Sequence, residues 1–197
     1  MSARAILYLA SASPRRRELL SLLEYPFDVL SVQVEERRDP GEAPADYVQR
    51  LACDKSQAGW LACAGEKPVL GADTIVVFGQ EVLEKPQDFA DAQRILQLLS
   101  GQTHTVMTAV ALSSAQGCEV ILVNSQVTFR KLTQAEILRY WQSGEPADKA
   151  GAYGIQGIGG KFVSHLSGSY SAVVGLPLLE TDMLLQKILS PHMTSDY

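Results

Sequence analysis

Apolar and polar residues follow two different periods along the chain, and the pattern predicts strands and helices that intermix from end to end. Short apolar runs predict strands, whereas apolar stripes at helical spacing predict helices. The expected strands are 5–10, 27–32, 69–78, 81–83, 103–112, 119–130 and a short pair near 162–163. The expected helices are 14–24, 44–63, 88–100, 133–142 and 177–188. This order favours an α/β fold with a mixed sheet, built either as one sheet or as two lobes around a cleft.

Local signals fix several ends and faces of these elements. Ser13 with Pro14 is a helix start, and Thr133 with Glu136 forms a capping box. A loop is expected at 168–170, and the residues from Ser190 onward are expected to be a frayed tail. The first helix is expected to bury Leu19, Leu20, Leu22 and Leu23, and the last helix Leu178, Leu179, Met183 and Leu184.

Composition narrows the class of protein. The 197 residues carry a net charge of -5, so no broad positive field favours nucleic acid or an anionic membrane as partner. The three cysteines are an odd number without a Cys-x-x-Cys pair, which favours reduced thiols over a disulfide framework. No apolar stretch reaches membrane-spanning length and no signal-peptide pattern begins the chain. We therefore expect a soluble cytoplasmic protein.

Three consecutive arginines, 15–17, follow the first predicted strand at the start of a helix. The helix macrodipole places positive charge at that end, so arginine is an unusual choice there. Backbone N–H groups, the hydroxyls of Ser11 and Ser13, and the guanidinium groups could together bind phosphate oxygens. The alternative is a solvated, basic helix start.

Asp73 lies in a run that is otherwise apolar or small from Val69 to Phe78. A buried carboxylate without partners costs several kcal/mol or becomes protonated. Asp73 could be a metal ligand or a general base at a strand end, or it could simply cap a turn.

Other charged residues gain meaning as a group. Lys85 precedes a proline and is therefore held extended, Glu35 and Glu36 form an acidic pair in a loop, and Lys55 lies on a helix that otherwise faces the core. Each is a weak signal when taken alone. Together they suit a metal–triphosphate site, where carboxylates hold a divalent cation and basic groups take up phosphate charge.

A glycine-dense segment, 149–157, is a third candidate. Glycine permits close approach of a ligand to the backbone, and Gln156 offers a donor and an acceptor to the edge of a base. A simple turn between two strands is the alternative. Walker, Gly-x-Gly-x-x-Gly, zinc and nucleophile-elbow patterns do not occur in the sequence.

Several of these motifs, in collinear order from about residue 6 to residue 188, resemble the Maf family. The resemblance is carried by residues 9–16 with 18–20, 71–74, 84–86, 100–104, 149–157 and 174–177. It implies one Maf-like domain over residues 1–197, with an elongated mixed sheet and two lobes around a central cleft, related in fold to the inosine triphosphatases. Two departures are Ala12, often glycine in the family, and Arg17, commonly a polar uncharged residue.

The resemblance implies hydrolysis of a nucleoside triphosphate between its α- and β-phosphates, with Mg²⁺ or Mn²⁺ required. It further implies house-cleaning of non-standard nucleotides, a small-molecule substrate and, as is common among relatives, a homodimer. By position it assigns catalysis to Glu36, Lys55, Asp73 and Lys85, and metal binding to Glu36 and Asp73.

By the same resemblance, the residues that face the substrate are Ser11, Arg15, Arg16, Thr74 and Gln156. Arg15, Thr74 and Gln156 coincide with positions that sort the family by substrate, and they resemble the branch acting on dTTP and UTP. Asp73 would take a proton from the attacking water. Two alternatives are a nucleotide-binding regulator of cell division without turnover, and a non-specific phosphatase releasing orthophosphate.

Overall fold

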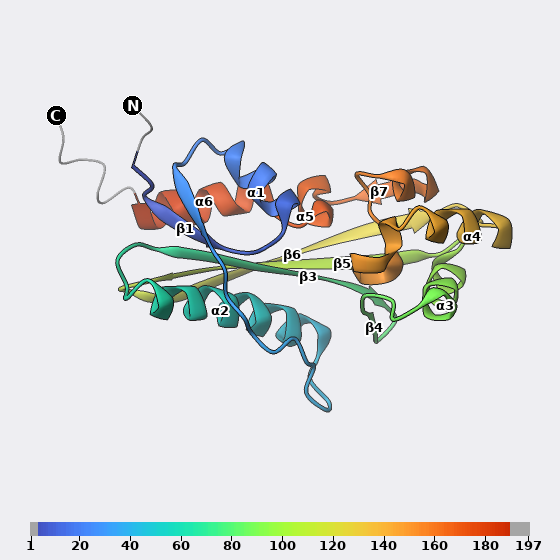
Figure 1. Cartoon of the computed structure of the whole chain (residues 1–197), viewed down its shortest axis with the longest axis horizontal. Helices are drawn as coiled ribbons and strands as arrows, with labels where there is room; N and C mark the ends of the chain where they lie inside the picture. The colour runs from blue at the N-terminus through green and yellow to red at the C-terminus, as the bar shows by residue number, and fades with distance from the viewer. Residues whose placement is uncertain (1–3, 190–197) are drawn as a thin grey trace. The chain divides into compact units, whose positions relative to one another are not determined.

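The computed structural model describes residues 4–189, and the expected frayed tail from Ser190 lies outside them. The strands are β1 (Leu7–Ala10), β2 (Phe27–Leu30), β3 (Val69–Phe78), β4 (Glu81–Leu83), β5 (Thr103–Ser114), β6 (Gly117–Phe129) and β7 (Val163–Ser167) (Figure 1). The α-helices are α1 (Pro14–Ser21), α2 (Pro44–Ala62), α3 (Phe89–Leu99), α4 (Gln134–Gln142), α5 (Tyr170–Val174) and α6 (Leu178–Leu189). Three 3₁₀ helices are η1 (Glu145–Asp148), η2 (Ala150–Ala152) and η3 (Ile158–Phe162).

The strands form one seven-stranded sheet in the order β2-β1-β3-β5-β6-β7, with β4 paired to β3. β1 runs parallel to both β2 and β3, whereas the pairs β3–β4 and β6–β7 are antiparallel. The predicted α/β fold with a mixed sheet and flanking helices is therefore confirmed.

Two compact units divide the chain. Unit 1 comprises the residues up to Asp73, Thr108–Leu122 and the residues from Gly175 onward, and unit 2 comprises Thr74–Met107 and Val123–Val174. The predicted cleft between two lobes, and the assignment of the whole chain to a single domain, stay predictions.

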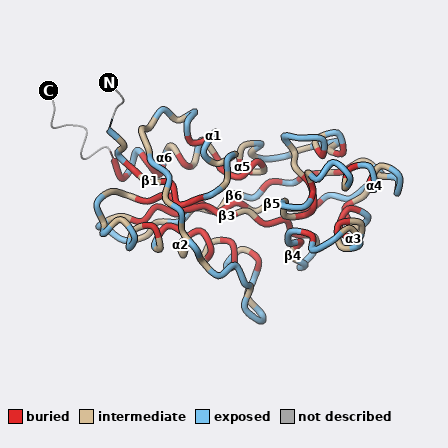
Figure 2. The backbone as a smooth tube through the Cα atoms, viewed as in Figure 1, coloured by how far each residue is buried: buried red, intermediate tan, exposed pale blue. Residues whose placement is uncertain are grey.

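In unit 1, α2 covers one face of the sheet, and α1 and α6 cover the opposite face (Figure 1). Buried positions line β1 and β3, as the red segments in Figure 2 show. The apolar stripe of α2 supplies Tyr47, Val48, Leu51 and Ala52, as its helical spacing predicted.

In unit 2, the core is rich in aromatic rings. Phe129 packs edge-on against Tyr153 and against Phe162, and Phe162 packs edge-on against Tyr140. The helix α4 begins with the predicted capping box, in which Thr133 and Glu136 satisfy each other's backbone N–H groups. These rings and the capped helix anchor the glycine-rich segment, which belongs to the same unit.

Some local expectations were wrong. The helix α1 ends at Ser21, and Leu22 is exposed. Leu179 and Met183 are exposed as well, because α6 buries the stripe through Thr181, Leu184, Leu185 and Ile188 and not the neighbouring one. Both stripes of this helix are apolar in sequence, so periodicity alone chose the wrong one.

The expected loop is confirmed at Gly168 and Ser169, and the short helix α5, which was not predicted, begins at Tyr170. Among residues 4–189, no helix combines the length and the apolar character that crossing a bilayer requires.

Candidate active site

Parallel pairing of β1 and β3 brings two predicted site segments close together. Ala10, the last residue of β1, pairs with Gly71 of β3. β3 continues beyond this pair in the same direction as β1, so the loop that begins at Ser11 emerges next to the part of β3 that carries Asp73. Ser13 then caps α1, accepting a hydrogen bond from the Arg16 backbone N–H at 3.4 Å. The arginine run therefore begins next to the buried aspartate.

Close packing of α2 against β3 brings a third side chain to this part of the sheet. A Cβ atom at Gly71 would lie 2.5 Å from the carbonyl oxygen of Ala52 and 2.6 Å from the backbone nitrogen of Ser56, so only glycine fits there. This contact places the turn of α2 that carries Lys55 directly over the strand that carries Asp73.

Lys55, Asp73 and Glu36 form a compact charged group. Lys55 Nζ lies 2.6 Å from Asp73 Oδ1 and 2.5 Å from Glu36 Oε1. The side chains of Lys55 and Asp73 are 10% and 11% exposed, whereas that of Glu36 is 44% exposed. The buried carboxylate is thus paired, as the cost of an isolated charge requires, and one ammonium group is shared by two acids.

Arg16 reaches the same group from α1. Its Nε donates to the carbonyl oxygen of Gly175 at 3.0 Å, and its Nη1 donates to Ser11 Oγ at 3.5 Å. Burial lowers the pKa of Arg16 from its ordinary value, while the charges of Asp73 and Glu36 oppose that change. Its half-buried neighbour Arg15 adds positive charge that also lowers the pKa of Arg16. Arg16 therefore brings positive charge to the acidic pair, with Arg15 as its neighbour.

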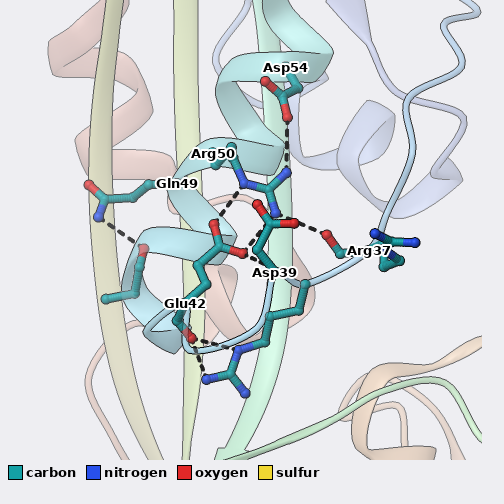
Figure 3. A network of polar contacts seen from close by, with 8 residues as sticks. Arg37, Asp39, Glu42, Gln49, Arg50 and Asp54 are labelled. Carbon is teal, nitrogen blue, oxygen red and sulfur yellow. Dashed lines mark hydrogen bonds and ion pairs between the residues drawn. The ribbon is translucent and has the colours of Figure 1, made fainter.

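The loop that carries Glu36 is tied to α2 by a network that the sequence analysis missed (Figure 3). Arg50 donates to both carboxylate oxygens of Glu42, at 2.7 and 2.8 Å, and to the carbonyl oxygen of Arg37 at 3.0 Å. The hydrogen bond from Arg50 lowers the pKa of Glu42 to about 2. Glu42 just before the helix and the Arg50–Asp54 pair at i,i+4 spacing were the available signals.

The acidic pair suits a hard divalent cation. One carboxylate oxygen of Glu36 and one of Asp73 both contact the Lys55 ammonium group, so the two acids lie close to each other. Within the described part of the chain, no group of three or more His, Cys, Asp or Glu could hold a metal by itself. Mg²⁺ is usually bound by one or two carboxylates together with water and substrate phosphates, so this limited donor set fits such an ion.

The remaining predicted residues belong to unit 2. Thr74 is half-buried in β3, and Lys85 and Gln156 are both exposed. The backbone N–H of Gly151 donates to the carbonyl oxygen of Glu84 at 3.3 Å, so the glycine-rich segment begins beside the strand exit that carries Lys85. The structure thus gathers Ser11, Arg15, Arg16, Glu36, Lys55 and Asp73 in unit 1, and it joins the Glu84–Lys85 and glycine-rich motifs within unit 2.

Comparison with known proteins is consistent along the chain. Residues 6–188 match the model of a family described as Maf-like protein. A dTTP/UTP pyrophosphatase of Pseudoalteromonas atlantica is 57% identical over 190 residues, covering 95% of this chain and 99% of the relative. A dTTP/UTP pyrophosphatase of Yersinia pestis is 60% identical over 184 residues, covering 93% of each chain.

Among solved structures, a nucleoside-triphosphatase / dITP/XTP pyrophosphatase of Mycobacterium abscessus aligns with 97% of this chain and 99% of its own, at 16% identity and a TM-score of 0.49.

Proposed function

The chain belongs to the Maf family, and from that premise we propose that it is a nucleoside triphosphate pyrophosphatase acting on dTTP and UTP. The products are the nucleoside monophosphate and pyrophosphate. The names of the two relatives support this substrate class, because more than half of the residues are identical over nearly the whole chain. A regulator that binds nucleotides without turnover is not favoured, since those relatives are named as enzymes.

One structural observation carries the proposal: Asp73 and Glu36 share Lys55, and Arg16 interacts with both acids. A binding protein for polyphosphate would need the positive groups alone. A buried carboxylate among them weakens phosphate binding and is useful only if it acts on water or holds a cation.

In the proposed reaction, Asp73 accepts a proton from the water that attacks the α-phosphorus, and the bond to the bridging oxygen of the β-phosphate breaks. Lys55, Arg15 and Arg16 stabilise the negative charge that develops on the transferring phosphorus and on the leaving pyrophosphate. Glu36 and Asp73 would hold a divalent cation, Mg²⁺ or Mn²⁺, which supplies Lewis-acid polarisation of phosphate oxygens.

Four further residues are proposed to recognise the substrate, two through its phosphates and two through its base. The Ser11 hydroxyl would donate a hydrogen bond to a phosphate oxygen, and the Lys85 ammonium group would neutralise phosphate charge. Gln156 would read the pyrimidine edge with its amide, and Thr74 would assist it. Gln156 is exposed, so its amide is available to a ligand.

The test is a product analysis with dTTP, UTP and GTP at matched concentrations, with Mg²⁺ or Mn²⁺ and with a chelator. We expect pyrophosphate and the monophosphate from dTTP and UTP, slower turnover of GTP, and loss of activity with the chelator. Release of orthophosphate would instead identify a phosphatase, and binding of dTTP without any product would identify a regulator.

The base-reading role has a separate test in Gln156→Ala. Removing the amide should lower the ratio of kcat/KM for dTTP to that for GTP by about tenfold, the scale of one or two lost hydrogen bonds. A variant that keeps the wild-type ratio would assign base recognition to other residues, while leaving the pyrophosphatase activity itself in place.

A further inference from the structure

The glycine-rich segment of unit 2 folds into a tight turn that presents Gln156. The backbone N–H of Gly157 donates to the carbonyl oxygen of Gly154 at 3.2 Å, so Ile155 and Gln156 occupy the two corner positions. The 3₁₀ helix η3 follows at once, from Ile158. A two-residue corner has few internal contacts, and something outside the turn must therefore fix its orientation.

The carboxylate of Glu145 accepts hydrogen bonds from the two residues at the start of η3, just after this turn. Its Oε2 accepts a hydrogen bond from the backbone N–H of Ile158 at 2.8 Å, and its Oε1 accepts one from the backbone N–H of Gly159 at 3.0 Å. Because Glu145 begins η1, thirteen residues before Ile158, these bonds close a loop around the whole glycine-rich segment.

The hydroxyl of Tyr140 binds the first residue of the turn, Gly154, and also contacts Glu145. It donates to Glu145 Oε1 at 2.7 Å and accepts a hydrogen bond from the backbone N–H of Gly154 at 3.0 Å. The turn is thus held at both ends by two side chains that are bonded to each other. We refer to Glu145 and Tyr140 as the clamp.

Two glycines, Gly157 in the turn and Gly159 in η3, leave room for the clamp. A Cβ atom at Gly157 would overlap the Glu145 carboxylate, and one at Gly159 would lie 2.5 Å from the Tyr140 hydroxyl oxygen. The absence of side chains at these two positions is therefore required for the clamp to close, and not only for flexibility of the backbone.

The clamp is itself rigid. Tyr140 is 1% exposed and its ring packs edge-on against Phe162, with ring centroids 4.9 Å apart. Burial raises the pKa of Glu145, but the hydrogen bonds from Gly159, Tyr140 and Ile158 outweigh it, so that the pKa lies below its ordinary value. Glu145 therefore stays an ionised acceptor at neutral pH, which suits a group that must accept three hydrogen bonds.

From this geometry we infer that Glu145, acting with Tyr140, is a positioning residue that sets the pyrimidine preference by fixing the corner on which Gln156 is presented. The inference rests on the proposed base-reading role of Gln156. Preorganisation of a recognition group in this way raises discrimination without adding any contact to the ligand.

Two variants break the clamp from opposite sides. Glu145→Gln keeps the size of the side chain but sets an amide NH₂ against a backbone N–H, and Gly157→Ala displaces the carboxylate by steric overlap. Each should lower the ratio of kcat/KM for dTTP to that for GTP by about tenfold, through a higher KM for dTTP, the scale of one lost charge-assisted hydrogen bond. The kcat for dTTP should stay within about twofold of wild type, which also reports that the protein is folded.

Glu81→Gln is the matched control. Glu81 is an exposed carboxylate of the same unit and pairs with Arg94, so removing its charge should leave the ratio unchanged. The decisive measurement is the double variant Glu145→Gln with Gln156→Ala. If Glu145 acts through Gln156, the first substitution should change the ratio no further once the second is present.

The outcomes separate the two proposals. If Gln156→Ala loses the preference while Glu145→Gln and Gly157→Ala keep it, the clamp inference is overturned and the role of Gln156 stands. If Gln156→Ala keeps the preference, the base-reading role fails and the inference fails with it. Additive effects in the double variant would show that Glu145 acts by another route, which also overturns the inference.

Discussion

The charged centre of unit 1 and the glycine-rich turn of unit 2 are each organised by a carboxylate, yet they satisfy it in opposite ways. Asp73 is paired with a side-chain ammonium group at 2.6 Å, whereas Glu145 is bonded to backbone N–H groups and a tyrosine hydroxyl. A carboxylate paired with a mobile charged group can exchange partners when a ligand arrives. A carboxylate bonded to the backbone fixes the chain around it. The first arrangement suits chemistry and the second suits recognition.

The strongest way to test this contrast is to remove the charge of Asp73 while keeping its shape. Asp73→Asn should lower kcat for dTTP by about 10² or more, because a positioned general base contributes on that scale. The measurement is pyrophosphate release at saturating dTTP. Asp28→Asn, an exposed aspartate of β2 in the same unit, is the control and should keep wild-type turnover. Undiminished turnover of Asp73→Asn would remove Asp73 from the mechanism.

The next largest effect should appear when the shared cation of unit 1 is removed. Lys55→Met leaves the mostly buried Asp73 carboxylate without its partner, and breaking such a pair costs about 3 kcal/mol. The free energy of unfolding from urea titration measures this loss. Lys187→Met breaks an exposed pair with Glu119 and should cost less than about 1 kcal/mol. Equal losses in the two variants would mean that Lys55 is not a buried counter-ion.

Unit 2 should respond to pH through His104, which is 2% exposed and bonded through Nε2 to the Tyr153 hydroxyl at 2.8 Å. Burial lowers the pKa of His104 from 6.5 to about 4. The unfolded chain therefore binds the extra proton first, so stability is complete above pH 6.5 and falls as the pH drops toward 4, by about 2 to 3 kcal/mol.

The measurement is the free energy of unfolding at several pH values between 7 and 4.5. His104→Gln should flatten the curve over this range, because the titrating group is gone. His165→Gln replaces an exposed histidine of β7 and should keep the wild-type curve. A curve for His104→Gln as steep as that of the wild type would assign the pH dependence to other groups.

The smallest expected effect concerns the loop that carries Glu36. Arg50→Met removes the hydrogen bonds to Glu42 and to the Arg37 carbonyl, so the loop should become mobile and KM for dTTP should rise by up to about fivefold. Arg94→Met removes an exposed ion pair of unit 2 and is the control. An unchanged KM for Arg50→Met would show that Glu36 is placed without this network.

The sequence predicted most elements because local signals decided them. The apolar run of β3 is bounded by a proline and a glycine, and its predicted limits, 69–78, agree with the structure. The capping box of α4 is equally local. By contrast, the choice between two apolar stripes on α6 depends on which neighbour it packs against, and Leu179 and Met183 were placed inward wrongly for that reason.

The candidate site was predictable as a set of residues but not as a geometry. Asp73 drew attention as a charge in an apolar strand, yet its partner Lys55 is 18 residues away and is identified only by the packing of α2 on β3. Glu145 was missed because its partners include backbone N–H groups, which leave no mark on residue type. Arg50 has the side-chain partners Glu42 and Asp54, but its hydrogen bond to the Arg37 carbonyl, which holds the loop, has no counterpart in residue type.

The close contact at Gly71 affects how the activity of variants at this position should be interpreted. With no free space between helix and strand at that point, an added methyl group there cannot be absorbed locally and must push the helix outward. Such a shift would move the Lys55 ammonium group away from the Asp73 carboxylate. An activity assay on such a variant would then show a loss of turnover that arises from displaced packing and not from the loss of a catalytic group.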